Sequence, residues 1–60
     1  MTLSEILTVI TEDTDITIKL GVKQLFNGYK EEIVLEERYM NCTVQYIWFS
    51  KFYNTMMIEL

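Results

Sequence analysis

The fold is decided by two segments near the C-terminal end, CTVQYIWF at residues 42–49 and TMMIEL at residues 55–60. Because successive side chains of a strand point to opposite faces, each segment divides into two rows. Residues 50–54 join the segments, a length that is common between paired strands. The two segments therefore predict a β-hairpin. Its inner face is expected to hold Cys42, Val44, Tyr46, Trp48, Met56, Ile58 and Leu60.

The same hairpin carries more large apolar side chains than one covering helix can bury. Contiguous exposed apolar patches of this kind rarely persist on monomeric proteins. We therefore expect an interface, buried against a second copy of the chain or against a target protein, and the sequence leaves both occupants open. The expected interface residues are Ile47, Phe49, Phe52, Tyr53 and Met57.

The first ten residues predict a short amphipathic helix. Leu3, Ile6, Leu7 and Ile10 recur at helical spacing. Thr2 precedes this pattern and stands three residues before Glu5, the spacing of a capping box in which each side chain binds the other residue's free backbone N–H. A helix of about three turns is marginal in isolation, so it is expected to pack on the sheet.

Residues 15–20 alternate between apolar and polar side chains, the pattern of an antiparallel strand with one wet face. Gly21 is expected to open a turn, and residues 22–29 to return as a second strand in which Asn27-Gly28 marks a bulge or the strand's end. Residues 30–40 are ambiguous. The alternation of Ile33, Leu35 and Tyr39 fits a strand, whereas the glutamates favour a short helix, which we prefer.

Together these segments predict one small α+β domain over residues 1–60. An N-terminal amphipathic helix packs on an antiparallel sheet of about four strands, with room for a short second helix.

The composition argues against an enzyme. The chain has no histidine and a single cysteine, so it offers neither an internal disulfide, nor a Ser/His or Cys/His pair, nor the usual zinc ligands. Cys42 is expected to be a small buried hydrophobe. Gly21 and Gly28 stand alone and form no phosphate loop. We therefore assign no catalytic, cofactor-binding or metal-binding residue. A carboxylate-metal enzyme is disfavoured because no glycine-turned loop accompanies the acids.

The charge pattern argues against nucleic-acid binding. A formal net charge of -4 opposes a phosphate-binding surface. Glu31, Glu32, Glu36 and Glu37 are a possible acidic contact face that mimics phosphates, although ordinary solubilising charge of this size is typical of small domains. No apolar run is long enough to span a bilayer, and the N-terminus lacks the features of a signal peptide. We expect a soluble protein of the bacterial cytoplasm, and the lone cysteine agrees with a reducing compartment.

The layout also carries a resemblance. It begins Met1-Thr2-Leu3-Ser4-Glu5-Ile6-Leu7, continues with a polar turn, an Asp-Ile-Thr-Ile strand and an Asn27-Gly28 step, and closes on a hairpin. In size and layout it resembles the very short proteins of bacteriophages and prophages, and among them it is similar to small anti-defence inhibitors such as anti-Hachiman proteins. The resemblance implies a homodimeric inhibitor that binds a host defence protein, and it assigns a role to no residue. The alternative is a small structural or regulatory subunit of a phage or bacterial assembly.

Overall fold

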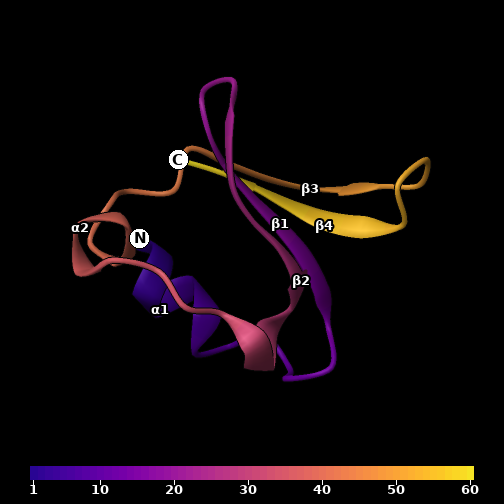
Figure 1. Ribbon diagram of the computed structural model, residues 1–60, viewed down its shortest axis with the longest axis horizontal. Helices are drawn as coiled ribbons and strands as arrows, with labels where there is room; N and C mark the ends of the chain where they lie inside the picture. Colours follow the sequence, from indigo (N-terminus) through magenta and orange to yellow (C-terminus); the bar gives the residue numbers. More distant parts are fainter.

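The computed structural model describes residues 1–60 and contains one sheet and two short α-helices (Figure 1). In chain order the elements are α1 (Leu3–Leu7), β1 (Asp15–Leu20), β2 (Lys23–Tyr29), the 3-10 turn η1 (Lys30–Glu32), α2 (Glu37–Met40), β3 (Tyr46–Ser50) and β4 (Thr55–Glu59). The predicted α+β class, with its N-terminal helix and four strands, is confirmed.

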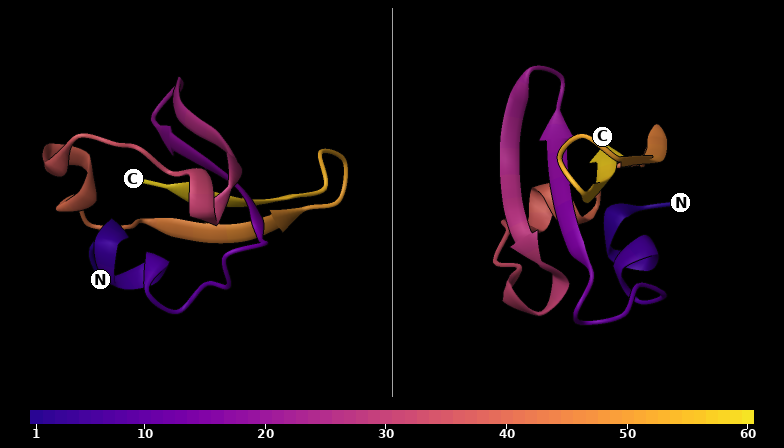
Figure 2. Two further views of the ribbon diagram at one scale, coloured as in Figure 1. Left: turned by 60° about the horizontal axis from the view of Figure 1, so that its bottom comes forward. Right: turned by 90° about the vertical axis from the view of Figure 1, so that its right-hand side faces the viewer.

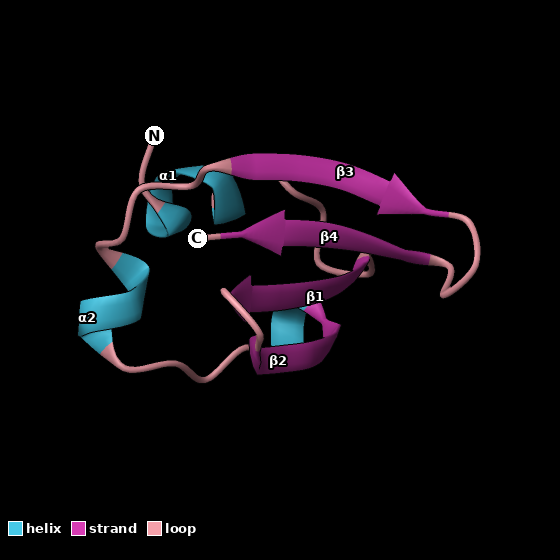
Figure 3. Ribbon diagram, turned by 90° about the horizontal axis from the view of Figure 1, so that it is seen from above, coloured by secondary structure: helices cyan, strands magenta, loops and turns pink.

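The sheet is mixed rather than wholly antiparallel. Its strands lie in the order β2-β1-β4-β3, as Figure 3 shows from above. Each of the two hairpins, β1–β2 and β3–β4, is antiparallel as expected, but the hairpins join through a parallel pairing of β1 with β4. The parallel pairing arises because the chain crosses from β2 at one edge to β3 at the other, so that β4 returns beside β1. It sets two buried residues, Ile18 and Ile58, directly side by side.

The first helix begins with the expected capping box. The Thr2 hydroxyl accepts from the Glu5 backbone N–H at 3.3 Å, and the Glu5 carboxylate accepts from the Thr2 backbone N–H at 2.8 Å. The helix ends at Leu7, earlier than its apolar spacing predicts. The Thr8 hydroxyl donates to the Glu5 carbonyl at 2.6 Å at this end, and a hydroxyl that bonds back to the helix backbone competes with its continuation.

Residues 30–40 form η1 and α2, with an extended stretch between them. The preference for helix is therefore confirmed at both ends of the segment. The alternation of Ile33 and Leu35 has a structural role as well, since both residues lie in the extended stretch and pack against the core. α2 then lies beside α1 (Figure 1).

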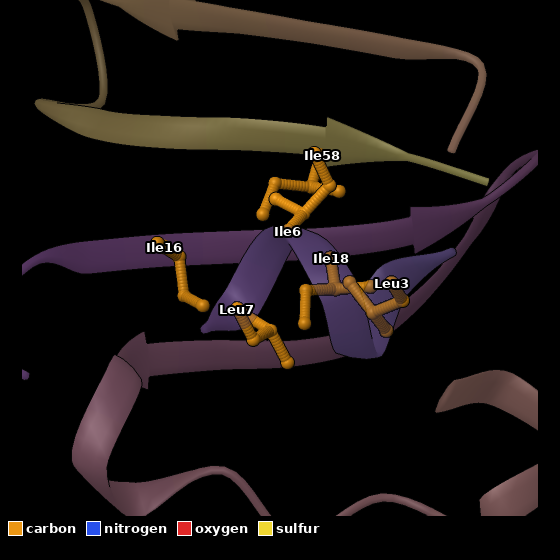
Figure 4. Packing of buried hydrophobic residues seen from close by; sticks show 6 residues of the cluster. All are labelled: Leu3, Ile6, Leu7, Ile16, Ile18 and Ile58. Carbon is orange, nitrogen blue, oxygen red and sulfur yellow. The ribbon is translucent and has the colours of Figure 1, made fainter. Parts of the chain in front are cut away.

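The core lies between α1 and one face of the sheet (Figure 4). It consists of Leu3, Ile6, Leu7, Ile16, Ile18 and Ile58. We call this side of the sheet the helix face (Figure 2). No helix covers the opposite side, which we call the open face (Figure 3). A core this small supplies limited stability, and domains of this size commonly gain more by associating.

Candidate interaction surface

β3 is an edge strand that presents no protecting charge. Its five residues, Tyr46 to Ser50, include no Lys, Arg, Asp, Glu or Pro, and only β4 pairs with it. The other edge strand, β2, differs because it carries Lys23 and pairs with β1 through a register shift beside Ile18 and Lys19. Proteins blunt sheet edges with such charges and bulges, because a bare edge offers free N–H and C=O groups to another strand. The N-terminal residues bond the chain just before β3, through a bridge between Thr2 and Thr43, but from Tyr46 to Ser50 β3 keeps an edge that a second strand can extend.

The apolar side chains of β3 are exposed on both faces of the sheet. Ile47 lies opposite the buried Ile58 and Phe49 opposite Met56, so both belong to the helix face. Tyr46 and Trp48 belong to the open face. Their exposed fractions are 68% for Tyr46, 45% for Ile47, 47% for Trp48 and 56% for Phe49.

The expected burial of Tyr46 and Trp48 in the core is wrong. The register pairs Ile47 with Ile58, so the row of Ile47 and Phe49 shares a face with the core, and the row of Tyr46 and Trp48 lies on the opposite face. A shift of one residue moves every side chain of a strand to the other face, and turn geometry decides the register when both rows are apolar. Residues 46–49 are apolar in both rows, so their sequence contains no alternation that could indicate the inner face. Cys42 and Val44 precede β3 and are half-buried.

The connection between β3 and β4 extends the exposed surface. Phe52 and Tyr53 are 87% and 72% exposed, and their rings meet edge to face with centroids 4.8 Å apart. The Tyr53 backbone N–H donates to the Ser50 hydroxyl at 3.2 Å, and Asn54 adopts a φ of 52° that returns the chain to β4. The turn extends away from both helices (Figure 1). We call the exposed residues Tyr46, Ile47, Trp48, Phe49, Phe52 and Tyr53 the hairpin surface.

Met57 does not belong to the hairpin surface, although it was expected there. It is only 7% exposed and helps to line a hollow of about 360 Å³ on the open face. Most of the residues that line it are polar, and the set comprises Thr17, Lys19, Gln24, Asn27, Tyr53, Thr55 and Met57. The alternation of residues 15–20 predicts only that Thr17 lies on a wet strand face. Alternation along one strand carries no signal for such a hollow, because the lining residues come from β1, β2, β4 and the turn before β4.

Three side chains of the hollow form a hydrogen-bonded row. The Asn27 amide donates to the Thr17 hydroxyl at 2.7 Å, and the hydroxyls of Thr17 and Thr55 lie 3.1 Å apart. Thr17 and Thr55 are buried, yet each finds a partner in this row. The row thus joins β2, β1 and β4 across the open face.

The four glutamates of the possible acidic contact face lie on two separate elements. Glu31 and Glu32 belong to η1, whereas Glu36 and Glu37 lie at the start of α2. The Glu32 carboxylate accepts from the Tyr29 backbone N–H at 3.2 Å, and the Glu36 carboxylate lies 3.0 Å from the Arg38 guanidinium. Two of the four acids therefore have partners within the chain.

The remaining reactive groups have structural partners. The Cys42 thiol donates to the Arg38 carbonyl at 3.3 Å. Hydrogen bonds from the backbone N–H and then the hydroxyl of Thr2 lower the pKa of Glu5, which caps α1. No three metal-ligating side chains come together. Neither helix has the length and apolar character needed to cross a membrane.

Comparisons with known proteins add no relative. The chain matches no protein-family model, and neither the curated proteins nor the solved structures include a significant match to it.

Proposed function

We propose that the protein acts without catalysis, as a homodimeric binding protein whose contact region is the hairpin surface. The observation that carries this proposal is the gathering of large exposed apolar side chains on an edge hairpin, away from the helices. Isolated exposed apolar residues are normal, but a contiguous group marks a contact site.

The size of the hairpin surface supports this function. Aromatic side chains bury on the order of 150–250 Å² each, so the exposed fractions of the five aromatic residues of this surface correspond to roughly 500–800 Å² per chain. A standard protein interface buries about 800 Å² per partner. The surface is therefore large enough to supply most of one specific contact.

For the target, we propose a host protein of a bacterial anti-phage defence system, met in the host cytoplasm and inhibited by binding. The resemblance in layout to small phage anti-defence inhibitors supports this choice. The second candidate is a small subunit of a phage or bacterial assembly. The uncharged edge of β3 favours an assembly subunit as much as an inhibitor, because such an edge can extend the sheet of a neighbouring subunit.

An affinity pull-down from bacteria that carry defence systems tests the proposal. The informative variant replaces both turn aromatics, Phe52→Ser with Tyr53→Ser, which removes contact area without touching the core. Its matched control is Val22→Ser with Val34→Ser, two exposed apolar residues outside the hairpin surface.

A defence protein that is retained by wild type and control but lost with the turn variant supports the proposal, provided that the purified protein also inhibits it. Recovery of virion or housekeeping complexes alone favours the assembly subunit. A partner that binds the turn variant as well as wild type would show that the hairpin surface is not the contact region.

A further inference from the structure

The exposed side chains of β3 require a partner that reaches both faces of the sheet at once. Ile47 and Phe49 lie on the helix face, whereas Tyr46 and Trp48 lie on the open face. A partner that packs flat against one face covers one pair and leaves the other in water. A strand added at the edge of β3 brings side chains beside both pairs.

A second copy of β3 satisfies this requirement. Its sequence, YIWFS, is uncharged, so pairing it with itself brings no like charges together although the chain has a net charge of -4. Symmetric two-fold contacts are also the commonest in homo-oligomers. We propose that β3 pairs antiparallel with β3 of a second copy, joining the two four-stranded sheets into one of eight strands. The inference rests on the proposed homodimer: it assigns the β3 part of the hairpin surface to the second copy and leaves the turn residues Phe52 and Tyr53 for the target.

Symmetry restricts the register of this pairing. A two-fold axis that makes strands antiparallel stands perpendicular to the sheet, so it keeps helix face with helix face. Directly opposed residues then share a face, and the axis must pass beside a single residue rather than between two. Each possible centre within β3 therefore predicts a different set of pairs.

Trp48, the middle residue of β3, is the centre that pairs the whole strand with itself. It sets Trp48 opposite its own symmetry mate, Ile47 opposite Phe49, and Tyr46 opposite Ser50. A centre at Phe49 would instead place the charged Lys51 opposite Ile47, and a centre at Ile47 would place the polar Gln45 opposite Phe49.

The centre at Trp48 makes consistent contacts on both faces. On the helix face, Ile47 and Phe49 of each copy form one apolar row across the junction, next to Ile58 and Met56. On the open face the two Trp48 rings lie side by side. The indole N–H of Trp48 already donates to the Glu59 carboxylate within its own chain, so burial of Trp48 in the pairing does not leave this N–H without an acceptor.

Single-cysteine cross-linking tests the register, with Cys42→Ser as the background because Cys42 is the only native thiol. Ile47→Cys and Phe49→Cys are prepared as separate proteins, both of which keep Trp48. Each variant by itself, and a mixture of the two, is then treated with oxidised glutathione. Opposed residues in antiparallel strands have Cα atoms about 4.5–5.5 Å apart, within disulfide range. By contrast, the Cα atom of Ile47 lies about 8 Å from the Cα atom of Ile47 in the second copy, because the two are offset by two residues along the strands, and the same holds for Phe49. That distance is too long for a disulfide.

The expected result is at least a fivefold excess of disulfide-linked dimer in the mixture over either variant alone. Trp48→Cys, which lies opposite its own symmetry mate in this register, should also link to itself. Equal linking of Ile47→Cys with itself would overturn the register.

A wild type that is dimeric by light scattering while the mixture fails to link would overturn edge pairing but leave a homodimer in place. A wild type that is monomeric at micromolar concentration would overturn the dimer, whereas target binding is decided separately by the turn variant.

Discussion

Thr2 illustrates how single residues stabilise a helix that is too short to form alone. It starts α1 with both halves of a capping box, and α1 has only five residues. We predict that Thr2→Ala lowers the free energy of unfolding by about 1 kcal/mol, the usual cost of losing a threonine N-cap. Thermal unfolding followed by circular dichroism measures the change. Thr8→Ala is the control, because Thr8 lies at the other end of α1, and it should cost clearly less.

Glu5 adds a pH dependence to the same cap. Its folded pKa is lowered from 4.5 by the Thr2 backbone N–H and hydroxyl, so the stabilisation is fully present above that pH. It is lost as the pH falls from 4.5 through the lowered folded pKa. Glu5→Gln keeps a carbonyl acceptor but cannot titrate, so the stability gap between wild type and this variant should narrow below about pH 4.5. Glu12→Gln, at an exposed acid outside the cap, is the control. The stability gap caused by Glu5→Gln should narrow in the same way when Glu12→Gln is also present.

Ile58 is the core residue through which β4 contacts α1, and it has no exposed surface. Deleting one buried methyl group from isoleucine typically costs about 0.5–1.5 kcal/mol. We predict a loss in that range for Ile58→Val, measured by urea unfolding at one fixed protein concentration. Val34→Ala, at a residue that is largely exposed, is the control and should change stability by less than about 0.5 kcal/mol. Equal losses would contradict the described core.

At the scale of elements, the polar row of the open face links β1 to β4. Thr17 and Thr55 are both buried and bond each other, so removing one hydroxyl deprives the other of that partner. We predict that Thr17→Val and Thr55→Val each cost about 1–3 kcal/mol, whereas the double variant costs less than the sum, since the bond between the two hydroxyls can be lost only once. A double-mutant cycle by urea unfolding measures the coupling, and strict additivity would contradict the bond.

The elements also show what the sequence could predict. Local signals identified α1, β1 and the two hairpins, because a capping box, an alternation and a glycine turn act over a few residues. The parallel pairing of β1 with β4 was not predictable in this way, since it depends on where the chain crosses between the hairpins. The inner face of β3 was predicted wrongly because its local pattern is ambiguous. Both of its rows are apolar, so its local pattern fits either face equally well.

At the scale of the whole molecule, the sequence predicted an apolar surplus on the hairpin but not its complete membership. Ile47, Phe49, Phe52 and Tyr53 are exposed as expected, Tyr46 and Trp48 join them, and Met57 turns into the hollow. The whole chain supplies the reason for the surplus. One five-residue helix covers a four-stranded sheet, and the turn end of the β3–β4 hairpin extends away from it (Figure 1).

A small core combined with a large exposed edge makes stability depend on association. If two copies pair through β3, unfolding of the dimer separates two chains, so mass action raises the unfolding temperature with protein concentration. We predict a rise of several degrees for wild type between about 5 and 500 μM, because the linkage contributes about 1.4 kcal/mol per tenfold change in concentration. Scanning calorimetry across that range measures the rise. Phe49→Lys, which places a charge on the edge, should flatten the dependence, whereas Val34→Lys makes a similar change outside the hairpin surface and should preserve it. A wild-type unfolding temperature that is constant across the range would contradict association through any surface of the folded chain.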